Sequence, residues 1–460
     1  MCGNAHKDRL KLKNPQLSLE RNIQEKSYHF DDSDYWRIIP KWKEIRPETF
    51  GCYKWQQKNS ITTIRKLEEI TEGLLSKKVI EDIDNGLLKT RMNMRITPYI
   101  FSRINWDNYK DDPLRRQFIP LGTEFLPEHP QNTEDSLAED KYKVTQYLVH
   151  RYPNKALFLP ITICPVYCTF CTRSRLVGGS TAVKSKSSYG AKSTNWNETF
   201  DYIRNTPTIE DIVISGGDAL LLRPQQIRQI GIELLKIKHI RRIRFATKGL
   251  AIMPMKFTSD QDWLEALSVV AKIGKEKMKE VALHTHINSY AEITKWTLQA
   301  MEVLHKTGVR VRNQSVLIAG VNDEFLSIQK TMKQLAHLMI EPYYVYLHDM
   351  IPGCEHMRTP LHIAEDISLK LQGSMTGFNT PRVVCDTPGG GGKRDVSSYI
   401  KYNREVGISA WTSPSVKPGK IFYYYDPVHK LSKEGKMLWS NDKLIKSSIN
   451  DFKNSIRKLI

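Results

Sequence analysis

The stretch "ALFLPITICPVYCTFC" (residues 156–171) joins a short apolar run to a loop that holds three cysteines. Cys164, Cys168 and Cys171 have the spacing C-x3-C-x2-C. Structural zinc sites are usually closed by four ligands, and iron–sulfur clusters are held by cysteine thiolates, ordinarily four of them. Three thiolates therefore leave one iron of a cluster open to a further ligand. A zinc loop that a distant Cys or His completes is the alternative.

The apolar run before these cysteines is the first of six that alternate with helical patterns. Near-continuous apolar strands separated by helices are typical of a parallel sheet covered by helices. We therefore predict an α/β fold, a partial (β/α)6 barrel, in which functional residues lie at the C-terminal ends of strands. The six runs are 156–163, 211–217, 242–248, 280–286, 309–318 and 342–349.

The rest of the chain divides into segments of different composition. The first 50 residues are polar and charged, and we expect them to wrap loosely on the body. The stretch "DDPLRRQFIP" (111–120) predicts an exposed, turn-rich connection, and the Ser/Lys/Gly-rich stretch 178–195 predicts a flexible surface insertion. The predicted division is a polar N-terminal extension (1–50), a helical N-terminal region (51–150), the barrel (151–365) and a C-terminal extension (366–460).

Composition restricts the compartment and the membrane partners. Hydrophobic residues make up 40% and charged residues 26% of the 460-residue chain, as in ordinary globular proteins. No apolar run approaches the roughly 20 residues of a membrane helix, and the N-terminus lacks the apolar region of a secretory signal. We expect a cytoplasmic protein without a membrane partner, with an organelle matrix as the alternative because the first residues are basic. Seven cysteines, three of them clustered, favour a reducing compartment.

The net charge of +19 allows more than one interpretation. Such a charge attracts nucleic acid or anionic small molecules, or it reflects a lysine-rich solvated surface. The charge is spread along the chain without an RNA-recognition signature. We therefore favour the solvated surface and expect no nucleic-acid partner.

The cysteine spacing resembles the signature of radical S-adenosylmethionine enzymes. Phe170, directly before the third cysteine, takes the aromatic position that these enzymes use against the cofactor. The segment "SGGD" (215–218) follows the second predicted strand and resembles the family's Gly-Gly-Glu segment, in which glycine lets the backbone approach the methionyl group. The resemblance implies a radical S-adenosylmethionine barrel with a [4Fe–4S] cluster on the three cysteines, S-adenosylmethionine on the open iron, and an electron donor as partner.

Further motifs, collinear from residue 53 to residue 393, resemble the lysine 2,3-aminomutase family, in which pyridoxal 5′-phosphate is the second cofactor. The segment "DTPGGGGK" (386–393) alone would suggest only a glycine turn or an anion cradle, since it lacks the spacing of a P-loop. The motifs are "KWQQKN", "ITPYI…DDPLRRQFIP", "HRYPNKALFLPITICPVYCTFCTR", "DIVISGGDALLL", "NQSVLIAGVND", "EPYYVYLHDMIPGCEHMRTP" and "DTPGGGGK".

This resemblance assigns roles residue by residue. Lys393 matches the lysine that forms a Schiff base with pyridoxal 5′-phosphate. Arg151 and Lys155 match phosphate-binding positions, although Lys155 stands where an arginine is frequent and cannot bind bidentately, and Tyr152 lies near the ring. The positions matched to the substrate are Arg173 for the α-carboxylate and Asp349 and Asp386 for a distal ammonium. The positions matched to S-adenosylmethionine are Phe170, Ser215, Gly216, Gly217, Asp218, His286 and Gln314.

The resemblance implies an isomerase that moves the α-amino group of a free amino acid from C2 to C3. Asp349 and Asp386 favour a basic side chain, because a buried ammonium needs carboxylate partners. L-Lysine, which gives β-lysine, is therefore the predicted small-molecule substrate, and arginine is an alternative because carboxylates bind both cations. A lysine on a protein, an RNA, and a non-catalytic role in binding an amino acid are further alternatives.

The chain departs from the family at two places. It has no cysteine after Cys385, whereas the bacterial aminomutase has a C-terminal cysteine cluster that binds zinc between subunits. We therefore expect no zinc site, and a homo-oligomer stays open. Lys248 and Gly249 stand where an Arg-Thr-Pro run is more usual, which leaves the exact substrate open.

Overall fold

Ten strands form one sheet whose spatial order follows the chain, and three more form a small antiparallel sheet. The computed structural model describes residues 30–187 and 196–459. The large sheet consists of β1 (Lys143–Thr145), β2 (Leu148–Tyr152), β3 (Lys155–Ile161), β4 (Asp211–Gly216), β5 (Arg242–Ala246), β6 (Glu280–Thr285), β7 (Arg310–Val316), β8 (Glu341–Tyr346), β9 (Arg382–Thr387) and β10 (Gly392–Asp395). The small sheet consists of β11 (Lys401–Asn403), β12 (Ile408–Thr412) and β13 (Ile421–Tyr425).

The six predicted strands are β3 to β8, and each pairs in parallel with the next, so the predicted partial barrel is confirmed. Side chains alternate across such a sheet. On β5, Ile243 and Phe245 are fully buried, whereas Arg242 and Arg244 lie on the opposite face. The parallel direction brings every C-terminal strand end to one edge.

The sheet contains a seventh parallel strand that the sequence analysis missed. β9 pairs in parallel with β8, and β10 returns antiparallel to β9. The run "VVCDT" (383–387) is short and leads directly into four glycines, so it was interpreted only as part of the glycine segment. The sheet therefore continues past residue 365, where the C-terminal extension was predicted to begin; the four-part division itself stays a prediction.

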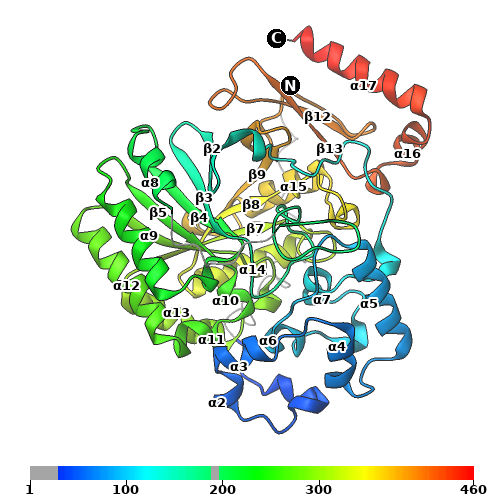
Figure 1. The fold of residues 1–460 in the computed structure, drawn as a ribbon. Helices are drawn as coiled ribbons and strands as arrows, with labels where there is room; N and C mark the ends of the chain where they lie inside the picture. The colour runs from blue at the N-terminus through cyan, green and yellow to red at the C-terminus, as the bar shows by residue number, and fades with distance from the viewer. Residues whose placement is uncertain (1–29, 188–195, 460) are drawn as a thin grey trace, which may run out of the picture.

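Helices cover the sheet on its outer side and extend the molecule at both ends (Figure 1). In this view α8, α9, α12 and α13 lie along one side, the N-terminal helices lie below, and α16 and α17 lie at the top. Over the described residues, no helix combines the length and apolar character needed to cross a membrane. The α-helices are α2 (Pro47–Phe50), α3 (Tyr53–Lys58), α4 (Ile64–Thr71), α5 (Lys77–Lys89), α6 (Pro98–Phe101), α7 (Pro113–Phe118), α8 (Asn197–Arg204), α9 (Pro224–Lys236), α10 (Gly249–Ile252), α11 (Met255–Ser259), α12 (Gln261–Glu276), α13 (Lys295–Thr307), α14 (Phe325–His337), α15 (Leu361–Leu371), α16 (Lys433–Trp439) and α17 (Asp442–Arg457).

The N-terminal segment packs more tightly than its polarity predicts. Residues 1–29 lie outside the described part, but residues 30–50 contribute Trp36, Ile39, Trp42 and Phe50 to the core. The Trp36 ring stacks on Phe50 with centroids 4.2 Å apart. The expectation of a loosely wrapped extension was therefore wrong for residues 30–50. In this segment Trp36 and Trp42 come from short turns of 3-10 helix. Such turns are too short to give the repeating apolar pattern by which a buried helix is predicted from sequence.

One predicted loop also differs from expectation, and a second is only partly described. "DDPLRRQFIP" contains α7, and Leu114, Arg115 and Phe118 are buried, so the prediction of an exposed connection was wrong. The Arg115 guanidinium lies 2.6 Å from Glu124, a pairing that sequence spacing did not reveal. Of the predicted insertion, residues 188–195 lie outside the described part, and Lys186 ties the preceding residues to the body through the Val177 carbonyl.

Trp36→Ala tests whether the N-terminal segment belongs to the core. Trp36 is 1% exposed and its indole N–H donates to the Ile45 carbonyl at 3.0 Å. Truncation should lower the free energy of unfolding by about 3–5 kcal/mol. Chemical denaturation measures the change, with Ile38→Ala as the control, because Ile38 is 56% exposed in the same turn. Equal, small effects of both variants would contradict the packing described.

Candidate active site

The three cysteines lie in the loop that leaves β3. Cys164, Cys168 and Cys171 are half-buried free thiols. Burial raises the pKa of Cys168 to about 12, and burial, the Asp218 charge and the two other thiols raise the pKa of Cys164. All three lie within one eight-residue stretch, and Cys164 and Cys171 pack against the same apolar cluster. Thiols with raised pKa values stay protonated near neutral pH, and they lose their protons when they bind a metal. Three such thiols in one loop therefore fit the ligand set of a metal cluster.

A single metal ion would need its ligands to converge on one point. Over the described ranges, no group of three or more His, Cys, Asp or Glu side chains has that arrangement. The irons of a cluster are separate, and each meets its own thiolate.

The glycine segment after β4 packs directly against the start of the cysteine loop. The N–H of Gly217 donates to the Ile161 carbonyl at 2.6 Å, and a Cβ on Gly217 would lie 2.2 Å from the Ile163 oxygen. Gly216 has a φ of +98°. A side chain at either glycine would clash with the chain between β3 and the cysteine loop, so this contact alone requires glycine at both positions. The approach of a cofactor to these glycines stays a prediction. Ser215 precedes them on β4 and is half-buried.

Asp218 ends this segment with a carboxylate that backbone groups already hold. One oxygen accepts from the Leu220 N–H at 2.8 Å and the other from the Lys248 N–H at 2.9 Å. Burial raises the pKa of this carboxyl, although these hydrogen bonds oppose the shift. Asp218 therefore joins the end of β4 to the end of β5.

Phe170 and His286 face each other beside the cysteine loop. Their ring centroids are 5.6 Å apart in an edge-on arrangement. Burial and the Lys248 charge lower the pKa of His286 well below its usual value, so the imidazole is neutral. Gln314, also predicted for this site, is half-buried on β7 and pairs in register with Tyr344. Phe170, His286 and the glycine segment thus come together where strands end, and Gln314 lies inside a strand.

Lys393 and Asp386 are cross-strand neighbours in the β9–β10 hairpin. The Lys393 ammonium lies 3.2 Å from an Asp386 oxygen, and the Arg151 guanidinium lies 2.8 Å from the same oxygen. Burial is the largest single influence and lowers the pKa of Lys393, but Asp386, Tyr346 and Tyr152 together outweigh it and hold that pKa well above its usual value. The other Asp386 oxygen is buried and lacks a hydrogen-bond partner in the described part of the chain. An additional donor would satisfy it.

Three cations surround the Tyr152 ring. Arg151, Lys155 and Lys393 lie 4.8, 4.2 and 5.1 Å from its centroid. Burial, and then the charge of Lys393, lowers the pKa of Lys155 to about 8. Cations crowded in this way are stabilised by an anion, so the group fits a phosphate. The adjoining glycines 389, 390 and 392 all have positive φ and make the turn between the strands.

Asp349 lies near this group but has a different partner. It follows β8, and the Thr172 hydroxyl donates to it at 2.6 Å. Burial, and then the charge of Asp386, raises the pKa of Asp349 to about 7. The structure thus brings the two predicted aspartates together, with Asp386 ionised and Asp349 titrating near neutrality. Thr172 was not predicted for the site.

Arg173 has a partner that the sequence analysis did not single out. The Glu139 carboxylate accepts from its Nε at 3.1 Å and from its Nη2 at 2.8 Å. Glu139 therefore occupies one edge of the guanidinium and leaves the edge that includes Nη1 for another carboxylate. Ala138, directly before Glu139, has a φ of +54°. Nothing in the spacing of this acidic, polar stretch indicated the pairing.

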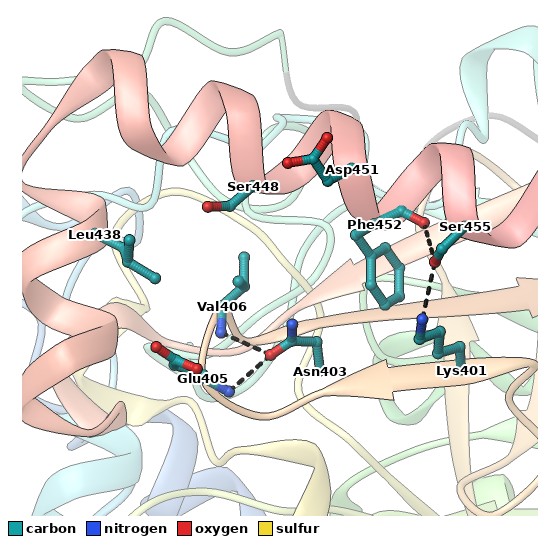
Figure 2. A pocket seen from close by; sticks show the side chains of 9 residues that line it. All are labelled: Lys401, Asn403, Glu405, Val406, Leu438, Ser448, Asp451, Phe452 and Ser455. Atoms are coloured by element: carbon teal, nitrogen blue, oxygen red, sulfur yellow. Dashed lines mark hydrogen bonds between the residues drawn. The ribbon is translucent and has the colours of Figure 1, made fainter.

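A cavity of about 430 Å³ lies apart from these residues, between β11 and α17 (Figure 2). Its lining includes Lys401, Asn403 and Phe452, all from the C-terminal extension. The Lys401 ammonium donates to Ser455 across the cavity at 2.9 Å. The predicted site residues lie elsewhere, so the cavity is not part of the candidate active site.

Comparisons with known proteins show which proteins the chain is similar to. The Radical SAM superfamily matches residues 158–332. The chain is 35% identical over 353 residues to L-lysine 2,3-aminomutase of Acetoanaerobium sticklandii, covering 76% of this chain and 80% of that protein. It is 34% identical to L-lysine 2,3-aminomutase of Bacillus subtilis (78% and 71% covered) and 30% identical to glutamate 2,3-aminomutase of Clostridioides difficile (75% and 76%). Among solved structures, a radical SAM methyltransferase from Sphaerobacter thermophilus covers 52% of this chain and 68% of its own, at 18% identity and a TM-score of 0.34.

Asp349→Asn should stabilise the fold more at alkaline than at acidic pH. The folded pKa is about 7 and the ordinary value is 3.8, so the folded state binds more protons than the unfolded state between these values. The destabilisation of the folded state by this carboxyl is therefore absent below pH 3.8, grows as the pH rises from 3.8 to about 7, and is complete above about pH 7. The free energy of unfolding of Asp349→Asn minus that of the wild type should rise by at most about 1.4 kcal/mol per pH unit in this range. Urea denaturation across the window measures it, and a difference independent of pH would contradict the assignment.

Proposed function

Because the chain belongs to the L-lysine 2,3-aminomutase family of radical S-adenosylmethionine enzymes, we propose that it moves the α-amino group of L-lysine from C2 to C3 and releases β-lysine. The observation that carries the choice of lysine is a pair of carboxylates near Lys393, the half-buried Asp349 and the buried Asp386. The radical aminomutase class follows from the family; the substrate and the roles below are the proposal.

Cys164, Cys168 and Cys171 would hold a [4Fe–4S] cluster, as the free thiols of one loop. With S-adenosylmethionine, the cluster supplies a 5′-deoxyadenosyl radical that removes and returns hydrogen. The S-adenosylmethionine site would be lined by the segment at the end of β4 and by side chains from the cysteine loop, the end of β6 and β7, namely Ser215, Gly216, Gly217, Asp218, Phe170, His286 and Gln314. Support comes from the buried, neutral His286 against Phe170, which presents an apolar surface, and from the glycine backbone against the cysteine loop.

Arg151, Tyr152 and Lys155 would hold pyridoxal 5′-phosphate, with Lys393 as its covalent anchor. When bound, that cofactor makes the migrating nitrogen part of a π-system. The support is the group of cations around the Tyr152 ring and the glycine turn beside Lys393. Lys393 must give up a proton before it can bond to the cofactor, and the Asp386 carboxylate, 3.2 Å away, is the nearest anionic acceptor described.

Arg173 would bind the substrate's α-carboxylate with the guanidinium edge that Glu139 leaves free. Asp349 and Asp386 would bind the distal ammonium, for which the unpartnered Asp386 oxygen offers an acceptor. A glutamate side chain would add a third carboxylate to this pair, and like charges at short range repel strongly in such surroundings. Arginine remains the second candidate, since a guanidinium can bridge two carboxylates.

The setting of the reaction is also proposed. The six described cysteines are all free, which supports a reducing compartment, and we place the enzyme in the cytoplasm. An electron donor would be its protein partner, and nucleic acid would play no part. Whether it forms a homo-oligomer is decided by measuring its mass in solution.

The proposal is tested by anaerobic turnover with mass-spectrometric detection of β-amino acids. Cluster-reconstituted protein receives pyridoxal 5′-phosphate, S-adenosylmethionine and dithionite, with lysine, arginine or glutamate offered separately. We expect β-lysine from lysine and no product from glutamate. β-Arginine alone would retain the reaction and replace the substrate. Cofactor cleavage without any β-amino acid would overturn the proposed function.

Lys393→Ala should abolish both turnover and the visible absorbance of bound pyridoxal 5′-phosphate, because the variant lacks the amine that anchors it. Lys401→Ala is the matched control, since Lys401 is an exposed lysine on β11, at the cavity that lies apart from the candidate site. A Lys393→Ala protein that kept full pyridoxal occupancy and activity would remove the assigned role.

Turnover of lysine should depend on the ionisation of Asp349. The pKa of Asp349 is about 7, so kcat/KM for lysine should fall as the pH drops below that value and the carboxyl loses its charge. Asp349→Asn should raise KM for lysine roughly 10- to 100-fold, which corresponds to about 1.5–3 kcal/mol for a charge-assisted hydrogen bond, and should lose this pH dependence. Steady-state kinetics across pH measures both, and an unchanged profile in the variant would place the titrating group elsewhere.

A further inference from the structure

Lys248 is a buried lysine at the centre of the proposed S-adenosylmethionine site. It follows β5 and is 6% exposed. Its ammonium lies 2.5 Å from the Glu292 carboxylate and donates to the His286 carbonyl at 2.7 Å. Its own backbone N–H donates to Asp218. One residue therefore contacts the chain after β4 and after β6, and the sequence analysis noted it only as a departure from the family.

The same ammonium faces the aromatic side of the cysteine loop. It lies 5.9 Å from the ring centroid of Phe170 and 5.6 Å from that of Phe118. Cys168 packs against the apolar cluster formed by Phe170, Ile318, Val321 and Met357, so the ammonium and this thiol adjoin the same group of side chains.

Glu292 is the counter-charge in this arrangement. It is fully buried, and one of its oxygens accepts from the N–H groups of Asn288 and Ser289 at 2.5 and 2.8 Å. The other oxygen meets only Lys248 among the ion pairs described. The pair thus fixes a positive charge 5.9 Å from the Phe170 ring centroid, with its counter-charge on the segment after β6.

We propose that Lys248 is a positioning residue that sets the reduction potential of the cluster held by Cys164, Cys168 and Cys171. This inference rests on the cluster assigned under the proposed function. One electron passes from an external one-electron donor to the cluster, and no bond is made or broken. Reduction adds negative charge to the cluster, and a nearby buried cation stabilises that charge more than it would in water. Net charge near a cluster is one of the quantities that set its potential.

A purely structural role for Lys248 makes a different prediction. If the lysine only tied three strand ends together, loss of either partner of the Lys248–Glu292 pair would disturb the site in the same way. An electrostatic role requires opposite effects, because removing the cation and removing the anion change the local charge in opposite directions.

The test is a potentiometric titration of the reconstituted full-length enzyme, followed by the electron paramagnetic resonance signal of the reduced cluster. Lys248→Met should shift the reduction potential to more negative values, and Glu292→Gln should shift it to more positive values. Lys248→Arg keeps the charge and should stay near the wild type.

Lys256→Met is the matched control. Lys256 is also a buried lysine, paired with Asp260 and 4.2 Å from the Tyr53 ring centroid, but its described partners lie outside the site. It should lose comparable packing without moving the potential.

Shifts of the same sign in Lys248→Met and Glu292→Gln, or no shift in either, would overturn the proposal. If Lys248→Met fails to fold or to take up iron, the sign of the Glu292→Gln shift and the constancy of Lys248→Arg decide it. A wild-type protein that binds no [4Fe–4S] cluster would instead remove the proposed function and this inference with it. A loaded wild type with unresponsive variants would remove the inference alone.

Discussion

Parallel pairing of seven consecutive strands is the constraint on which the rest of the structure depends. Because β3 to β9 run in one direction, their C-terminal ends meet at a single edge, although β3 and β9 are more than 200 residues apart in the chain. The cysteine loop, the glycine segment, His286, Asp349 and Asp386 all lie at or just after such ends. No local interaction could assemble these groups, because they come from segments far apart in the chain that the parallel sheet brings to one edge.

The site that this edge creates is crowded with charges, and several of them have a partner of opposite sign. Arg173 meets Glu139, Lys248 meets Glu292, and Lys393 shares Asp386 with Arg151. Removing one member of such a pair leaves an uncompensated charge in a low dielectric, which is strongly destabilising. The arrangement still leaves acceptors and guanidinium edges that a charged ligand can use.

The motifs predicted much of this site because its chemistry depends on residue type and spacing. The three cysteines, the glycines after β4, and the Asp386 and Lys393 pair were all named from sequence, and the structure brings them to one edge. Glu139 and Lys248 were missed as partners, since a buried ion pair between distant segments leaves no periodic signal. β9 was missed because a short strand that ends in a glycine turn resembles a loop.

The position of Asp386 links substrate choice to the state of Lys393. In the described structure, Asp386 is compensated by Lys393 and Arg151. Under the proposed function Lys393 would be bonded to the cofactor when the substrate arrives, so its ammonium would no longer compensate Asp386. A substrate with a distal ammonium would supply an equivalent cation to this carboxylate. A neutral or acidic side chain would leave a buried anion with one partner fewer, which opposes binding even where the substrate itself fits. Selection for a basic amino acid would therefore act through the charge balance at Asp386 as well as through the shape of the site.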